Sequence, residues 1–137
     1  MPDPLTQLPG YALRRASVAA MSELSERLQP FGLRFTESTV LMLIAANPGI
    51  RQSDLVRLLD IQRANMTPLV ARLEERGLVE RTPVDGRSWG LALSPEGVTL
   101  HAQLYDAVHA FEDDLITRVP EEYRAGLLPA LTALWSR

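Results

Sequence analysis

Residues 62–96 read QRANMTPLVARLEERGLVERTPVDGRSWGLALSPE, and this segment decides the fold of the chain. Its first half carries apolar residues at the spacing of one helical face, namely Met66, Leu69, Val70 and Leu73. Gly77 follows them and suits the left-handed conformation that commonly ends a helix. We therefore predict an amphipathic helix in the first half of the segment.

The second half of the segment has the pattern of a β-hairpin. Residues 78–82 and 89–93 are short runs that contain β-branched or aromatic residues. Between them, Pro83, Asp85 and Gly86 favour a turn. Two short strands joined by such a turn would form a hairpin that follows the helix directly.

A long helix is predicted after the hairpin. Ser94 can cap its start, and Pro95 fits the first helical position because that position needs no backbone N–H. An apolar stripe then runs along the helix, through Leu100, Leu104, Val108, Phe111, Leu115 and Val119. Pro120 ends it, and a last helix over Glu121–Trp135 must be kinked or divided at Pro129.

Three more helices are predicted before the quoted segment. The first covers Tyr11–Leu28, the second follows a cap at Thr36, and the third follows a cap at Ser53 and ends at Leu59. The second is apolar on nearly all sides, so it should be buried. Two short helices followed by a hairpin form a winged helix-turn-helix. The expected fold class is mainly α with a small β-hairpin wing (α+β).

The chain of 137 residues suffices for one hydrophobic core, so we expect a single domain over residues 1–137. Residues 36–94 would form the winged helix-turn-helix, flanked by long N- and C-terminal dimerisation helices over residues 9–31 and 95–137. The apolar stripes of these terminal helices exceed what so small a domain can cover, which favours a homodimer. The alternative is a monomer in which both termini fold back on the core.

Composition narrows the function classes. The chain has no cysteine, which excludes disulfides and thiolate metal sites. No apolar run is long enough to span a membrane and the first residues do not read as a leader, so a cytoplasmic protein without a membrane partner is expected. The spacings assemble neither a nucleophile with its base nor a pair of carboxylates in a pocket, so we expect no enzymatic activity and no cofactor.

The net charge of −3 is unusual for a nucleic-acid-binding protein, but the charges are unevenly distributed. All fourteen basic residues are arginines, and seven of them lie within residues 51–90. Arginine is suited to bidentate contacts with phosphate and guanine, although genome composition can also produce such a bias. The middle of the chain is therefore the candidate nucleic-acid-binding region.

Three motifs carry a family resemblance: RLEERGLVER at residues 72–81, DGR at 85–87 and LSPEG at 93–97. They are similar to the pattern around the recognition helix and wing of the MarR family of bacterial and archaeal transcription regulators. The order of the predicted helices matches that family over the whole chain. The resemblance implies a homodimer that binds a pseudo-palindromic operator in double-stranded DNA and represses nearby genes. It also implies release of the DNA when a small phenolic or aromatic acid binds.

The resemblance implies roles for individual residues. Arg72 would meet the DNA backbone, and Arg87 would reach into a minor groove with its guanidinium held by Asp85. Gln52 and Ser53 would meet a phosphate at the start of the third helix. These five residues are the expected DNA-positioning set.

Two of these arginines also have simpler interpretations. Arg72 could form an internal ion pair with Glu75 or Glu80, because acids lie nearby. Arg87 could be a solvated turn residue paired with Asp85, which would contribute under about 1 kcal/mol to stability. Only the surrounding motif favours DNA contact over these alternatives.

Pro68 departs from the family pattern, in which many relatives have an arginine that contacts DNA. Proline cannot donate to the Ala64 carbonyl, so the helix either starts with Thr67 as its cap or starts near Gln62 and bends at Pro68. We favour the bent helix. The candidates for base reading are polar residues of this helix: Gln62, Arg63, Asn65 and Thr67.

The resemblance places an effector site near the first helix. There Tyr11, Arg14 and Arg15 could bind an aromatic acid, although a surface role for these arginines is at least as plausible. Trp89 is expected to pack the wing against the core.

The alternative function is a winged-helix module that binds a partner protein without specific DNA binding. The acidic net charge of the chain and Pro68 would suit this alternative.

The helix expected after Pro95 carries side chains at a spacing that could indicate a metal site. His101, Tyr105 and His109 recur every four residues, with Asp113 four residues further on. This ladder also fits an exposed helix flank, and the drift of a helix separates its first and last members. No metal is therefore expected.

Overall fold

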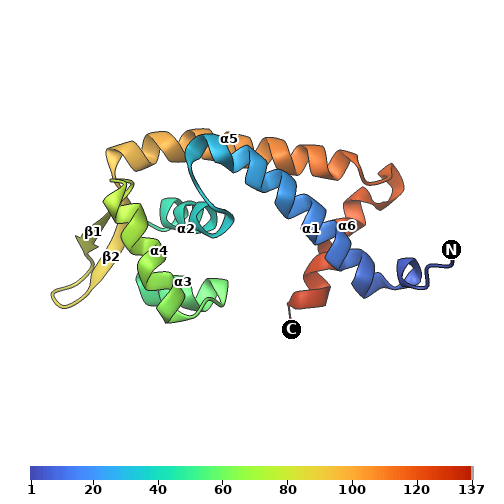
Figure 1. Ribbon diagram of the computed structural model, residues 1–137. Helices are drawn as coiled ribbons and strands as arrows, with labels where there is room; N and C mark the ends of the chain where they lie inside the picture. The colour runs from blue at the N-terminus through green and yellow to red at the C-terminus, as the bar shows by residue number, and fades with distance from the viewer. Residues whose placement is uncertain (137) are drawn as a thin grey trace.

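The structure is a computed structural model that describes residues 1–136, and it is mostly helical (Figure 1). The elements are, in order, α1 (Pro9–Leu28), α2 (Phe35–Ala46), α3 (Gln52–Leu59), α4 (Arg63–Glu75), β1 (Val79–Pro83), β2 (Trp89–Leu93), α5 (Pro95–Thr117) and α6 (Glu121–Trp135). Short 3-10 turns at Leu5–Gln7 and Gln29–Phe31 flank α1. The predicted fold class, helices with one β-hairpin, is confirmed.

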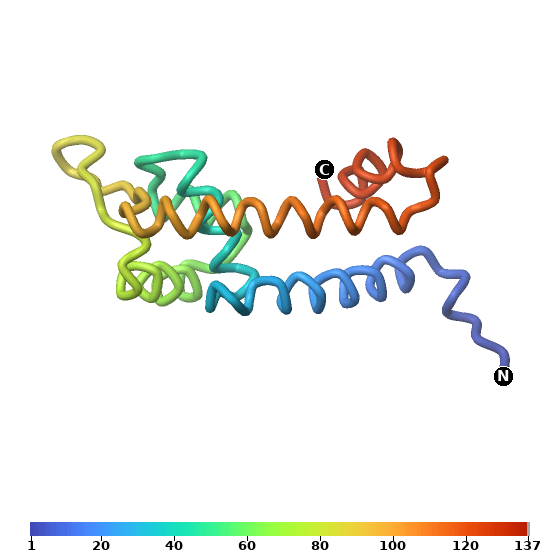
Figure 2. Tube along the Cα trace, turned by 90° about the horizontal axis from the view of Figure 1, so that it is seen from above, coloured from blue at the N-terminus to red at the C-terminus, as the bar shows by residue number. Residues whose placement is uncertain are grey.

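The molecule has a compact end and an extended end. Helices α2, α3 and α4 and the hairpin gather at one end, while α1 and α5 run side by side away from it (Figures 1 and 2). Helix α6 folds back beside the far end of α5 (Figure 2). The division into a winged helix-turn-helix and terminal dimerisation helices stays a prediction, and Arg137 of its C-terminal segment lies outside the described residues.

The hydrophobic core lies in the winged unit and under the adjoining half of α5. Its fully buried side chains come from helices α1 to α5 and from strand β2, and none comes from α6. They include Leu28, Leu41, Ile44, Leu55, Met66, Leu73, Leu91, Leu104 and Phe111. Helix α2 is central to this core, as its apolar sequence predicted, although Phe35 at its start is exposed. The apolar stripe of α4 faces inward, so its opposite face is free to meet a ligand.

The base of the wing is fixed to the loop between α2 and α3. Strands β1 and β2 pair antiparallel, with Val79 opposite Leu93 and Pro83 opposite Trp89. The backbone of Leu91 continues the pairing outward, because its N–H donates to Ile50 O at 2.8 Å and its carbonyl accepts from Gly49 N at 2.9 Å. A side chain at position 90 would collide with the carbonyl of residue 49, so glycine is required there.

Two predicted helix caps were wrong. Thr36 and Ser53 lie inside the first turns of α2 and α3 rather than before them. An acid reaches back in each case: the Glu37 carboxylate accepts from Arg34 N at 2.9 Å, and the Asp54 carboxylate accepts from the backbone N–H that precedes α3 at 3.2 Å. A carboxylate three residues into a helix is as good a partner for the free backbone donors as a hydroxyl cap.

The other predicted boundaries hold. Gly77 has φ of 72° and follows α4, as its left-handed conformation predicted. Ser94 caps α5, because its Oγ accepts from Gly97 N at 3.0 Å, and the same hydroxyl donates to the Gly77 carbonyl. Of the two outcomes predicted at Pro129, a kink or a division, the division is wrong, because α6 is continuous through that residue.

The extended end carries exposed apolar side chains. On α1 and α6 these include Leu13, Val18, Met21, Leu128, Leu131, Leu134 and Trp135. No residue of α6 is buried. Within residues 1–136, no helix is both long and apolar enough to cross a membrane. Such a surface is typical of a protein interface rather than of a free monomer.

Candidate nucleic-acid interface

Helix α4 presents a polar face to solvent. Its buried residues are Met66, Leu69, Val70 and Leu73, whereas the predicted base-reading residues are all exposed: Gln62, Arg63, Asn65 and Thr67. The helix has Gln62 as its N-cap and runs through Pro68, so the favoured start near Gln62 is confirmed and the alternative start at Thr67 is wrong. All four side chains are therefore accessible to a ligand.

Helix α3 is joined to this surface by a side-chain hydrogen bond. Gln52 Nε2 donates to Thr67 Oγ1 at 2.9 Å, and that hydroxyl donates onward to Arg63 O at 3.1 Å. Two residues that the sequence assigned separately to phosphate contact and base reading are thus a bonded pair. Ser53 is exposed beside Gln52 in the first turn of α3, where free backbone N–H groups attract an anion.

Arg72 has an internal partner that the sequence did not identify. Its Nε lies 3.5 Å from Oε2 of Glu37, a buried carboxylate on α2, and not against Glu75 or Glu80 as the alternative interpretation held. The Arg72 side chain is nevertheless 45% exposed, and this pair uses only one of its five N–H donors. The arginine is therefore anchored at one edge and open at the other.

The wing turn is organised by Asp85, but not in the expected way. Asp85 Oδ1 accepts from the backbone N–H groups of Arg87 and Ser88, both at 2.9 Å. Its Oδ2 pairs with the guanidinium of Arg51 at 3.2 Å. The prediction that Asp85 holds the Arg87 guanidinium is thus wrong, because the carboxylate is already occupied by backbone donors and by another arginine.

These contacts shift the ionisation of Asp85. The hydrogen bond from the Arg87 backbone N–H, followed by those from Ser88 and the charge of Arg51, holds the pKa of Asp85 below its usual value. The carboxylate is therefore ionised throughout the neutral range. The Arg87 side chain, in contrast, is exposed at the wing turn.

Most arginines of residues 51–90 are held by neighbouring groups. Five of the seven donate to a carboxylate or a carbonyl, namely Arg51, Arg57, Arg72, Arg76 and Arg81. Within residues 1–136, the guanidinium groups of Arg63 and Arg87 have no ion pair or hydrogen bond. The two unengaged cations thus lie on α4 and on the wing, where a DNA-binding surface would need them.

Comparison with known proteins agrees with this geometry. The family model described as MarR family matches residues 31–88, which span α2, α3, α4, β1 and the wing turn up to the start of β2. A protein of Thauera aromatica, assigned as a transcriptional regulatory protein for the hcr operon, is 32% identical over 129 residues. That alignment covers 92% of this chain and 78% of the relative. The chain belongs to the MarR family.

Solved MarR-family structures resemble the whole chain. The transcriptional repressor CouR bound to a 23-mer DNA duplex superposes with a TM-score of 0.86 at 34% identity, covering 95% of this chain and 94% of that one. CouR bound to p-coumaroyl-CoA gives a TM-score of 0.84 at 31% identity, covering 97% and 96%. The Mycobacterium tuberculosis protein Rv2887 in complex with salicylic acid gives 0.73 at 26% identity, covering 93% and 96%.

The residues of α1 that were predicted to bind an effector are brought together only in part. Arg15 Nη1 donates to Tyr11 Oη at 2.9 Å, and the guanidinium lies 5.8 Å from the ring centre. These two residues line an open pocket of about 360 Å³ with Asp3 and Thr6. Arg14 is exposed and does not line that pocket, so the predicted trio becomes a pair.

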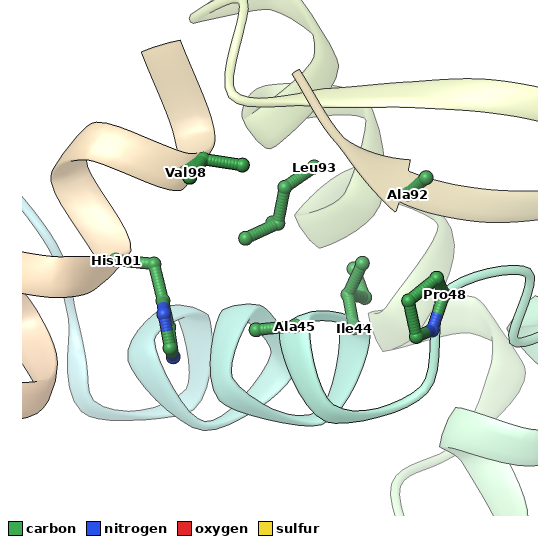
Figure 3. A pocket seen from close by; sticks show the side chains of 7 residues that line it. All are labelled: Ile44, Ala45, Pro48, Ala92, Leu93, Val98 and His101. Carbon is green, nitrogen blue, oxygen red and sulfur yellow. The ribbon is translucent and has the colours of Figure 1, made fainter. Parts of the chain in front are cut away.

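A second pocket lies at the wing end of this MarR-family fold. It has a volume of about 280 Å³ between α2, β2 and the start of α5, and His101 is its single titratable lining residue (Figure 3). Its other walls are apolar and include the small side chains of Ala45 and Ala92. No sequence pattern predicted this pocket, because its lining comes from two segments, 44–48 and 92–101, that are distant along the chain.

The structure also tests two predictions about aromatic residues, the ladder on α5 and the packing of Trp89. The rings of His101, Tyr105 and His109 do stack along α5, with centroids 6.0 Å and 4.0 Å apart. Among residues 1–136, however, no group of three or more His, Asp or Glu side chains could hold a metal ion. The expectation that Trp89 packs against the core was wrong, since its side chain is 58% exposed on the wing.

Proposed function

We propose that this protein is a homodimeric transcriptional repressor that binds a pseudo-palindromic DNA operator and releases it when a small aromatic or phenolic effector binds. It acts through binding alone, as regulators of its family do, and not as an enzyme. The observation that carries the proposal is the shared exposed face of α4 and the wing, on which Arg63 and Arg87 are the unengaged cations.

The parts of this face suit different parts of a duplex. The exposed polar residues of α4 have donors and acceptors that can read base edges in a major groove. Gln52 and Ser53 at the start of α3 are suited to a phosphate, since helix N-termini attract anions. Arg87 at the wing turn is suited to the adjacent minor groove, while Arg72 offers its free donors to the DNA backbone.

The apolar surface of α1 and α6 supports the homodimer. Leu128, Leu134 and Trp135 are more than half exposed in the single chain, which is costly for bulky apolar groups. Packing these helices against their copies would cover this surface and set two α4 helices at a fixed separation. Half-sites one helical turn apart require a separation of about 34 Å.

The effector is proposed to bind Tyr11 and Arg15. An aromatic ring and a guanidinium that are already in contact suit the two parts of an aromatic acid, one planar and one anionic. The aromatic ligands of the relatives CouR and Rv2887 support this class of effector. Arg14 is exposed one residue away and could pair with further negative charge, such as that of a coenzyme A thioester.

Selection of bound duplexes from a random DNA pool tests the proposal. We expect recovery of an inverted repeat whose half-sites lie about one helical turn apart. The operator so obtained is then titrated with salicylate and with p-coumaroyl-CoA, and Arg15→Ala should weaken the response while Ala45→Leu, which fills the other pocket, should not. Recovery of no enriched sequence would refute specific DNA binding and favour a protein partner.

A further inference from the structure

The wing is tied to the rest of the domain both near its base and at its tip. At its base, backbone hydrogen bonds join Leu91 to residues 49 and 50. At its tip, the tie is made by a side chain, that of Arg51, which is the residue immediately before α3. The second tie spans 34 positions of sequence and joins Arg51, which lies outside the three family motifs, to Asp85 of the DGR motif.

The geometry of the second tie is specific. Arg51 Nη2 donates to Asp85 Oδ2 at 3.2 Å and to Ser88 Oγ at 3.1 Å. Asp85 therefore divides its two oxygens, because Oδ1 holds the turn through backbone N–H groups and Oδ2 faces Arg51. One guanidinium thus holds both sides of the turn that carries Arg87.

We propose that Arg51 is a positioning residue for DNA binding, which sets the wing turn against the first turn of α3 and neutralises Asp85. This inference rests on the proposed function. A wing that pivots only about its base would present Arg87 in many orientations, and ordering it on binding would cost affinity. The free carboxylate of Asp85 would also lie beside the phosphates and repel them.

The size of the effect is limited by exposure. The side chains of Arg51 and Asp85 are 46% and 56% exposed, and exposed pairs contribute little each. We therefore expect Arg51→Gln to weaken operator binding about three- to five-fold. Because Arg51 does not itself meet a phosphate in this view, the dependence of affinity on salt concentration should stay within about half a unit of the wild-type slope.

A double-mutant cycle tests the pairing. The variants are Arg51→Gln, Asp85→Asn and both together, each titrated with operator DNA at several salt concentrations. Asparagine keeps an Oδ1 that can accept the turn hydrogen bonds but removes the charge that faces Arg51. In the Asp85→Asn background, Arg51→Gln should have a smaller further effect than in the wild type, because only the hydrogen bond to Ser88 Oγ remains to be lost. Arg57→Gln is the matched control, since Arg57 is on α3 and pairs with Asp54 away from the wing.

Two results would overturn the proposal. If Arg51→Gln lowers the salt slope by about 0.9 for each subunit and does so equally in the Asp85→Asn background, Arg51 is a direct phosphate contact. If Arg51→Gln binds operator as wild type does, the tie has no role in binding.

A measurement on the free protein separates this proposal from the proposed function. Amide hydrogen exchange of residues 84–90 should become about two- to five-fold faster in Arg51→Gln and stay unchanged in Arg57→Gln. Unchanged exchange in Arg51→Gln would refute the tie even if the wild-type protein bound no DNA at all. Faster exchange with no DNA binding by the wild type would retain the positioning of the wing and refute the repressor.

Discussion

Replacing Arg87 by alanine isolates the contribution of the wing to DNA binding. The Arg87 side chain is exposed and its guanidinium is unengaged, while its backbone N–H bonds Asp85 whatever the side chain is. The variant should therefore fold as wild type does, with a change in the free energy of unfolding within about 0.5 kcal/mol. Any large change in DNA affinity then reports on contact rather than on stability.

The magnitude follows from counterion release. Each phosphate contact contributes about 0.9 to the slope of log affinity against log salt concentration, and a dimer loses two wing contacts. The slope for Arg87→Ala should thus be smaller by about 1.8, measured by fluorescence anisotropy of a labelled operator between 50 and 300 mM salt, a range of about six-fold. The loss of affinity should be greatest at the lowest salt concentration.

Arg81→Ala is the control for simple charge removal. Arg81 is on β1 of the same hairpin, but both its Nε and Nη2 are held by the Glu74 carboxylate, at 3.3 and 2.9 Å. Its removal should leave the slope near the wild-type value. An unchanged slope for Arg87→Ala would show that Arg87 does not neutralise a phosphate, and equal losses for both variants would show that the wing acts only through its general charge. Either result would refute the reasoning.

Three further predictions concern folding and assembly. Gly90→Ala should lower the free energy of unfolding by about 2 kcal/mol or more, because its Cβ would collide with a backbone carbonyl, whereas Gly10→Ala has open space; urea denaturation of both variants checks this. Hydrogen bonds from Arg118, and then from a second arginine, hold the pKa of Glu23 below 4.5. The ionised Glu23 therefore stabilises the α1–α5 contact fully above pH 4.5, and this stabilisation is lost as the pH falls through the lowered pKa of the folded protein. Glu23→Gln should flatten the pH dependence of the urea midpoint between pH 2 and 6, a window of about four units around the carboxyl range. Leu134→Asp should shift sedimentation from dimer to monomer, and a variant that stays dimeric would place the interface elsewhere.

The sequence was sufficient for features that depend on neighbours along the chain. The face of α4, its end at Gly77 and the capping of α5 by Ser94 all follow from residues within one or two turns. The prediction of a helix cap failed where a hydroxyl and a carboxylate in the same turn could both bond the free backbone N–H groups. Thr36 is a good cap by type, but the helix begins one residue before it, where the Glu37 carboxylate accepts from Arg34 N, and nothing in local spacing ranks the two starts.

Partners that approach through tertiary structure could not be predicted. Arg72 has acids close to it in sequence, yet its partner Glu37 is 35 positions away on the buried side of α2. Asp85 is two residues from Arg87, yet its second oxygen pairs with Arg51. Such pairs depend on how α2, α3 and the wing pack together, which periodicity and motif spacing do not specify.

The acidic net charge is compatible with DNA binding because so few arginines are needed at the interface. With Arg63 and Arg87 as the unengaged cations of the winged unit, a dimer presents four, and these predict a salt slope of about 3.6 for the wild-type protein. If Arg72 also releases Glu37 or uses its free donors on phosphate, six contacts predict about 5.4. The slope of the wild-type protein, measured with the same operator, therefore decides whether Arg72 meets DNA. A slope near 3.6 that Arg72→Gln leaves unchanged would assign Arg72 to the α2–α4 contact alone and contradict its predicted role at the DNA backbone.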